Sequence, residues 1–156
     1  MEGARHATAD DVARLAELAR GAAEELRPLR GGDLFVNREA RREPFEDGFS
    51  SELASGEHIL LCGTVDDVVI GYASGRAEDL PDGRRLGVID DLFVEAEARA
   101  VGVGERMMDE LLAWFRTRGC VGVDAIALPG ARETKNFFEE SGFSARLLVM
   151  HHRLDR

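Results

Sequence analysis

The sequence has 156 residues, enough for one domain with a hydrophobic core of its own, and 44% of them are hydrophobic, which argues against disorder. Twenty Lys and Arg against thirty Asp and Glu give a formal net charge of −10, so the chain lacks the basic surface of a nucleic-acid-binding protein. No signal peptide or membrane-spanning apolar run is present, and we expect a single cytoplasmic domain over residues 1–156, without membrane contact.

The first third of the chain is only partly readable. Ala4–Ala7 is a plausible strand, and Thr8 has the character of an N-cap. An apolar stripe then predicts a helix that runs to about Leu26. From Asp33 to Gly56 the periodicity is poor, although Pro44–Ala54 could hold a second helix.

The middle of the chain predicts a β-hairpin. Two apolar runs, His58–Val65 and Val68–Arg76, flank the pair Asp66-Asp67. Asp-Asp fits a type I′ turn less well than Asn-Gly would. A polar loop, Ala77–Arg84, follows.

The second half alternates strands and helices. The predicted elements are a strand Arg85–Val94, a helix Gly102–Arg118, a strand Val121–Leu128, a helix Arg132–Ser141 and a strand Ser144–Arg153. The almost wholly apolar strand Val121–Leu128 should be buried on both faces. Hairpins first and helical crossovers later predict an α/β (α+β) domain with a mixed sheet and helices on both sides.

A strand, a glycine-containing turn and a long helix form the central stretch of the sequence. Gly102 and Gly104 lie where the helix begins, and Arg99 lies just before them. Unpaired N–H groups and the positive end of the helix dipole suit this turn to a phosphate. A dinucleotide fingerprint would need a third glycine where Met107 stands. The alternative is that the glycines merely relieve crowding against the sheet.

Three stretches carry a family resemblance. The pattern Arg-x-x-Gly-x-Gly at Arg99–Gly104, after the strand Ile89–Val94, resembles the acyl-CoA pyrophosphate loop of the GNAT-superfamily N-acetyltransferases. Asn136–Phe143 resembles the closing signature of that family, and Ala4–Leu26 loosely resembles its opening strand and helix. The resemblance implies the acyl-CoA N-acyltransferase fold, with a mixed, mostly antiparallel central sheet of six to seven strands flanked by helices.

The resemblance also implies acetyl-CoA as cosubstrate, without a metal. The backbone of Leu92, Phe93 and Val94 would then contact the pantetheine arm. The pyrophosphate would bind the backbone of the turn, with Arg99 nearby. The residues of that turn are Ala100, Val101, Gly102, Val103, Gly104 and Glu105.

Two adjacent acids in the central strand are candidate catalytic bases. An alkylamine with a pKa of ~10 needs roughly 4 kcal/mol to lose its proton at neutral pH, so a base is useful. Asp90 is the first candidate and Asp91 the second. Successive strand residues face opposite ways, so we expect one acid to face the acceptor and the other to face away. Either acid could instead bind an arginine.

The chain departs from the family where many members have a tyrosine that protonates the leaving thiolate. Phe138 occupies that place. An unassisted thiolate with a pKa of ~8.5 costs roughly 2 kcal/mol at neutral pH, less than the amine does, so transfer can survive without the acid. Cys62 and Cys120 show no metal or redox spacing and suit reduced core thiols.

The sequence therefore predicts an acetyl-CoA-dependent N-acetyltransferase that acts by direct transfer in a ternary complex. The acceptor would be a primary amine, either polyamine-like, amino-acid-like or part of a peptide. A non-catalytic acyl-CoA-binding module is the alternative, motivated by Phe138, and a nucleotide-binding regulator is a third hypothesis. Dimers are common in this family, and the apolar last strand could pair across a homodimer interface.

Overall fold

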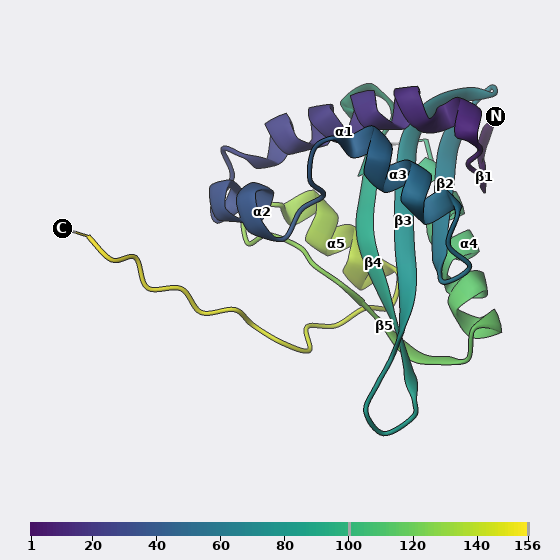
Figure 1. Cartoon of the computed structure of the whole chain (residues 1–156). Helices are drawn as coiled ribbons and strands as arrows, with labels where there is room; N and C mark the ends of the chain where they lie inside the picture. Colours follow the sequence, from purple (N-terminus) through teal and green to yellow (C-terminus); the bar gives the residue numbers. More distant parts are fainter. Residues whose placement is uncertain (100, 156) are drawn as a thin grey trace.

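The computed structural model describes residues 1–99 and 101–155 and contains one mixed sheet of five strands. The strands lie in the order of the sequence (Figure 1). They are β1 (Glu2–His6), β2 (His58–Val65), β3 (Val68–Asp79), β4 (Arg85–Val94) and β5 (Cys120–Ala125). β4 and β5 are parallel and all other neighbours are antiparallel, which confirms the mixed, mostly antiparallel sheet.

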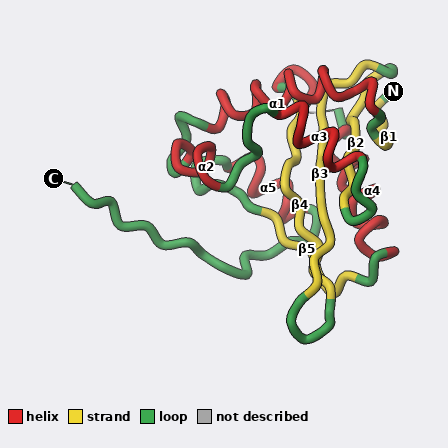
Figure 2. The backbone as a smooth tube through the Cα atoms, viewed as in Figure 1, coloured by secondary structure: helices red, strands yellow, loops and turns green. Residues whose placement is uncertain are grey.

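Helices cover both faces of this sheet, as Figures 1 and 2 show. The helices are α1 (Val12–Leu26), α2 (Gly32–Arg38), α3 (Phe45–Leu53), α4 (Val103–Thr117) and α5 (Arg132–Glu140), with short 3-10 turns at Ala9–Asp11 and Ala96–Ala98. α1 and α3 pack on one face, where Leu15 and Phe49 meet Tyr72 of β3. α4 and α5 pack on the other, where Met107 and Phe138 share a second cluster.

The hairpin prediction is confirmed, including its unusual turn. β2 and β3 pair up to Val65 and Val68, and the two residues between them have positive φ angles, 48° at Asp66 and 69° at Asp67. A type I′ turn requires this geometry, and aspartate tolerates it better than most residues.

β4 contains a bulge opposite β3. Ser74 pairs with Asp91, whereas the next β3 residue, Gly75, pairs with Ile89. Asp90 is therefore the extra residue in β4. A bulge bends its strand and redirects side chains, and it often lies beside a functional site.

β4 and β5 pair over only part of their length. Their register runs from Arg85 opposite Cys120 to Ile89 opposite Ala125. Beyond Ile89, residues 91–94 of β4 pair with β3 but have no β5 partner. The two parallel strands thus diverge next to the bulge, leaving one edge of β4 available to a ligand.

Two predictions about the fold were wrong. The sheet within the described residues has five strands rather than six to seven, because residues 144–153 run extended and exposed instead of forming a strand. β5 is an edge strand, and Val121 is 59% exposed rather than buried. The structure also adds α2, which begins at Gly32 directly after a left-handed Gly31 and lies mostly in the segment with poor periodicity. None of the helices described is long and apolar enough to cross a membrane.

Candidate functional site

The first turn of α4 lies after a left-handed glycine. Gly102 is the N-cap with φ 87°, a conformation that strains other residues. The N–H groups at the start of a helix have no partner within the helix, so they remain available to an anion. Of the expected pyrophosphate loop, Ala100 lies outside the described residues, while Val101 is exposed.

Crowding explains the second glycine of the loop. A Cβ on Gly104 would lie 3.2 Å from the ring of Phe137, so α5 packs directly across the start of α4. Gly104 therefore relieves crowding against α5, not against the sheet as the alternative supposed, whereas the backbone conformation requires Gly102.

Arg99 connects the loop to the sheet and to α1. Its Nε donates to the carbonyl oxygen of Val94 over 2.8 Å, and Nη2 donates to Glu25 over 2.8 Å. The hydrogen bond that Arg99 donates to Glu25 raises the pKa of Arg99 above its ordinary value. Its guanidinium also lies 5.6 Å from the Phe93 ring. Arg99 thus fixes the loop to the end of β4, besides adding positive charge there.

The open stretch of β4 alternates between the two cores. Leu92 packs toward the cluster under α4, and Phe93 packs toward the cluster under α1. The side chains of Leu92 and Phe93 are thus used for packing. What the free edge offers a ligand is backbone N–H and C=O groups.

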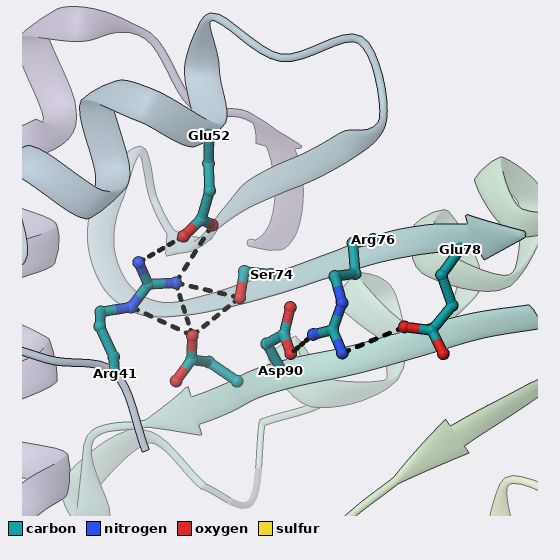
Figure 3. A network of polar contacts seen from close by, with 7 residues as sticks. Arg41, Glu52, Ser74, Arg76, Glu78 and Asp90 are labelled. Atoms are coloured by element: carbon teal, nitrogen blue, oxygen red, sulfur yellow. Dashed lines mark hydrogen bonds and ion pairs between the residues drawn. The ribbon is translucent and has the colours of Figure 1, made fainter. Parts of the chain in front are cut away.

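The two acids lie on the same face of the sheet, contrary to the prediction from strand alternation. Asp91 accepts a hydrogen bond from Ser74 Oγ at 2.8 Å, and Asp90 pairs with Arg76 (Figure 3). Ser74 and Arg76 are two residues apart on β3, so they point to one face. The bulge at Asp90 is the physical reason, because it interrupts the alternation in β4.

Asp91 belongs to a buried ionic cluster. Arg41 Nη2 lies 2.6 Å from Asp91, and its Nη1 lies 2.5 Å from Glu52 of α3. The Arg41 side chain is only 10% exposed and lies over the Phe49 ring at 3.9 Å. The alternative that an acid of this pair binds an arginine is therefore what the structure shows for both acids, Asp91 with Arg41 and Asp90 with Arg76.

Asp90 has a different environment. Its side chain is 32% exposed and pairs with Arg76, which also contacts Glu78. Desolvation raises the pKa of Asp90 above its ordinary value even though Arg76 opposes the shift. A carboxylate with a raised pKa binds a proton more tightly than one with the ordinary pKa, so it is the stronger base.

A cavity of about 490 Å³ lies between α1, α2 and β4. Asp91 and Tyr72 contribute to its wall, and Asp90 is not among the residues that line it. Four arginines line it as well: Arg20, Arg27, Arg41 and Arg42. Neither most of α2 nor Arg41 and Arg42 could be connected to β4 from sequence patterns, because they come from the segment with poor periodicity.

The remaining aromatic and cysteine residues with a possible chemical role lie in or beside the core. Phe138 is 8% exposed and packs 5.3 Å from the ring of Phe143, as expected of a core residue. Tyr72 is buried, and desolvation raises its pKa well above the ordinary value. Cys62 is a buried free thiol, whose pKa desolvation raises to about 12, whereas Cys120 is half-buried.

Comparison with known proteins agrees with this architecture. A family model described as "Acetyltransferase (GNAT) family" matches residues 22–143. The chain is 30% identical to glucosamine 6-phosphate N-acetyltransferase 1 of Oryza sativa subsp. japonica over 148 residues, which cover 83% of this chain and 87% of that protein.

Two solved structures share the fold. A tetramutant protein from Bacillus halodurans superimposes with a TM-score of 0.82 at 20% identity, covering 97% of this chain and 99% of that one. AAC(6')-Iy, in complex with the bisubstrate analogue CoA-S-monomethyl-acetylneamine, gives 0.75 at 15% identity, covering 100% and 99%. With its family match and its rice relative, the chain belongs to the GNAT family and is an N-acetyltransferase.

Proposed function

We propose that the chain transfers an acetyl group from acetyl-CoA to the primary amine of a small acceptor, with both substrates bound at once. The observation that carries this proposal is the bulge at Asp90. It lies where β4 and β5 begin to diverge, directly before the open edge of β4. Its neighbour Asp91 contributes to the wall of the cavity under α1 and α2.

The donor would bind along the open edge and across the start of α4. Backbone groups of Leu92, Phe93 and Val94 would take the pantetheine arm. The backbone from Ala100 to Glu105 would hold the pyrophosphate, because a helix N-terminus favours an anion. Arg99, already bonded to Val94 and Glu25, would keep this loop in place.

Asp90 would accept the proton of the acceptor ammonium, directly or through a water. Its raised pKa supports that role, whereas Asp91 is held by Arg41 and Ser74 and suits the positioning of charge in the cavity. The freed amine nitrogen then forms a bond to the thioester carbonyl carbon. A backbone N–H near Val94 would stabilise the oxyanion.

The nitrogen of that intermediate loses its second surplus proton to solvent, and collapse of the intermediate then breaks the C–S bond and releases the CoA thiolate. Phe138 carries no proton to give, and its ring is packed in the core. The thiolate would therefore take its proton from solvent, at a cost of roughly 2 kcal/mol at neutral pH.

The charges around the cavity favour an acceptor that carries an anionic group besides its amine. Arg20 is paired with Glu43 and Glu46, and Arg41 is paired inside the cluster. Arg27 lies 3.8 Å from Glu24, too far for a close hydrogen bond. Arg42 is exposed and donates only to a backbone oxygen at 3.4 Å within the described part of the chain. We therefore propose that these two weakly paired arginines attract an anion, such as the phosphate that the name of the rice relative specifies.

Thiol release from acetyl-CoA by the purified protein tests the proposal. The acceptors are glucosamine 6-phosphate, glucosamine as its matched partner without the phosphate, spermidine, amino acids and short peptides. We expect glucosamine 6-phosphate to exceed glucosamine by at least about tenfold in kcat/KM, since a charge-assisted hydrogen bond contributes roughly 1.5–3 kcal/mol.

The variant Arg42→Ala should reduce that preference, whereas Arg38→Ala, an exposed α2 arginine outside the cavity wall, should leave it intact. Equal kcat/KM values for glucosamine 6-phosphate and glucosamine would contradict the proposal that the acceptor needs an anionic group. Release with spermidine alone would move the acceptor class to polyamines. CoA binding without release from any amine would favour the non-catalytic alternative.

A further inference from the structure

The ionic cluster around Arg41 carries more negative than positive charge. Arg41 pairs with Asp91 of β4 and with Glu52 of α3, so one arginine faces two carboxylates and the formal net charge is −1. The side chains are 10% exposed in Arg41, 15% in Asp91 and 16% in Glu52. Within residues 1–99 and 101–155, Arg41 is the only cation in contact with either acid. A net charge held this far from water is costly unless a further cation compensates it.

The neighbouring cluster has the same imbalance. Arg76 pairs with both Asp90 and Glu78, beside the Arg41 cluster on the same face of the sheet (Figure 3). The two clusters together set two arginines against four carboxylates. This part of the sheet is therefore anionic even when every ion pair is formed.

Helix α3 is built to hold Arg41 and Glu52 in one geometry. Nη1 and Nη2 of Arg41 both donate to Glu52, at 2.5 and 3.1 Å. The ring of Phe49 lies 3.9 Å from the guanidinium. A Cβ on Gly48 would lie 3.2 Å from Arg41 Nη1, so glycine leaves room for the guanidinium, although it is a poor helix former.

Asp91 connects this cluster to the acceptor cavity. The hydrogen bonds from Arg41 and Ser74 all end on its Oδ2, and Oδ1 takes none of them. Asp91 contributes to the wall of the cavity of about 490 Å³, whereas Glu52 is not among the residues that line it. A cation in the cavity can therefore contact Asp91 and is attracted by the charge of Glu52 without touching it.

The cavity wall carries opposite charges in different places. Asp91 and Tyr72 come from the sheet, whereas the weakly paired Arg27 and Arg42 are exposed. An acceptor that carries both an ammonium and an anion is therefore oriented by the wall. Its ammonium lies toward the sheet and its anion toward the exposed arginines.

We propose that Glu52 sets the affinity for the ammonium of the acceptor. A primary amine is largely protonated in water at neutral pH, so it enters the cavity as a cation. Glu52 gives the Arg41 cluster its uncompensated negative charge, and the ammonium neutralises this charge when it contacts Asp91. Glu52 is a positioning residue, because it acts through its neighbours and touches no reacting atom. The inference rests on the acceptor cavity of the proposed function, but not on Asp90 as the base.

Equilibrium binding tests this role without turnover. The protein is saturated with CoA and titrated calorimetrically with glucosamine 6-phosphate and with glucose 6-phosphate, which has a hydroxyl in place of the ammonium. The wild type should bind the amino sugar about tenfold more tightly, because an uncompensated charge acts on its ammonium at short range. Glu52→Gln, which can still accept hydrogen bonds from Arg41, should remove most of this difference. Circular dichroism checks that each variant remains folded.

Two matched variants separate charge from shape. Glu52→Asp keeps the charge and should retain the preference for the amino sugar. Asp47→Asn removes an exposed acid from the same helix and should also retain it. Equal wild-type affinities for the two sugar phosphates, no binding of either one, or a preference that survives Glu52→Gln would each overturn the proposal.

Steady-state kinetics distinguishes binding of the acceptor from a general structural effect. Glu52→Gln should raise the KM for glucosamine 6-phosphate about tenfold at unchanged kcat, the pattern of lost ground-state binding. The KM for acetyl-CoA should stay at its wild-type value. A fall in kcat together with a higher KM for acetyl-CoA would instead show a merely structural role and overturn the proposal. A Glu52-dependent preference in binding without any acetyl transfer would support the role of Glu52 and contradict the proposed function.

Discussion

The Arg41 guanidinium lies 2.6 Å from the Asp91 carboxylate, joining two residues that are fifty positions apart in the sequence. Arg41 follows α2, and Asp91 lies on β4 beside the bulge. This contact connects the helical cover of the cavity to the strand that should bind the donor. It also fixes one of the two candidate acids, while the other, Asp90, pairs with Arg76 and has a pKa that desolvation raises.

Arg41 should be far more important for stability than an exposed arginine. Arg41→Met leaves Asp91 and Glu52 buried without their cation, and breaking such a pair costs about 3 kcal/mol. Arg20 is a matched control, since it also binds two carboxylates, Glu43 and Glu46, but is 47% exposed. Arg20→Met should cost much less, because solvent screens an exposed ion pair. Urea unfolding of both variants measures the difference, and equal losses would show that burial does not govern these clusters.

Asp90→Asn should lower kcat by about 100-fold, since a general base typically contributes that much or more. The KM for acetyl-CoA should stay unchanged, because the donor site is mostly backbone. In the wild type, kcat should fall as the pH drops through the raised pKa of Asp90, which must be ionised to accept a proton. In Asp90→Asn, kcat should no longer show this fall at acidic pH.

Asp109→Asn, which alters an exposed acid on α4, is the control for the same change in charge. If both variants keep wild-type kcat and pH dependence, Asp90 is not the base. A loss in the Asp90 variant that affects KM alone would instead assign it to binding.

Gly102→Ala should weaken CoA binding. Gly102 lies directly before α4 and Gly119 lies just after it, and their φ angles are both positive, 87° and 71°. Alanine at either position costs about 1 kcal/mol of stability. Only Gly102 adjoins the proposed pyrophosphate site, so Gly119→Ala should keep the CoA dissociation constant of the wild type. Calorimetric titration with CoA measures it, and equal affinities for both variants would place the pyrophosphate elsewhere.

The charge of Asp11 should stabilise the protein fully above about pH 4, and this stabilisation should diminish gradually as the pH falls further. Its carboxylate binds Arg5 at 2.8 and 2.9 Å and accepts the Thr8 N–H, and the hydrogen bonds from Arg5 hold its pKa well below the ordinary value. A lowered pKa gives stability that is present above the unfolded-state pKa of ~3.9 and is lost as the pH falls toward the folded-state value.

Asp11→Asn should therefore cost about 2 kcal/mol at pH 7, and its difference from the wild type should shrink steadily below pH 4. Urea unfolding across this pH range gives the comparison. Asp82→Asn, which breaks an exposed pair with Arg84, is the control and should change little at any pH. A constant difference across the range would mean that Asp11 acts through something other than its charge.

The sequence by itself determined the parts of this protein whose structure is local. The hairpin around Asp66-Asp67, the strand of β4 and the helix after Gly102 follow from apolar periodicity and turn residues, which depend on neighbours a few positions apart. The same local pattern, Arg99 to Gly104, was enough to indicate the family. A catalytic pair at Asp90 and Asp91 could be proposed because acids are unusual inside a strand.

Only the tertiary structure decided how those acids are used and where the sheet ends. The bulge at Asp90 arises from the register between β3 and β4, so strand alternation within β4 could not reveal that both acids share a face. Arg41 reaches Asp91 from a segment without readable periodicity. Residues 144–153 have the composition of a strand, but a strand forms only where a neighbour supplies hydrogen bonds and cover. That neighbour depends on long-range packing, which local sequence patterns do not encode.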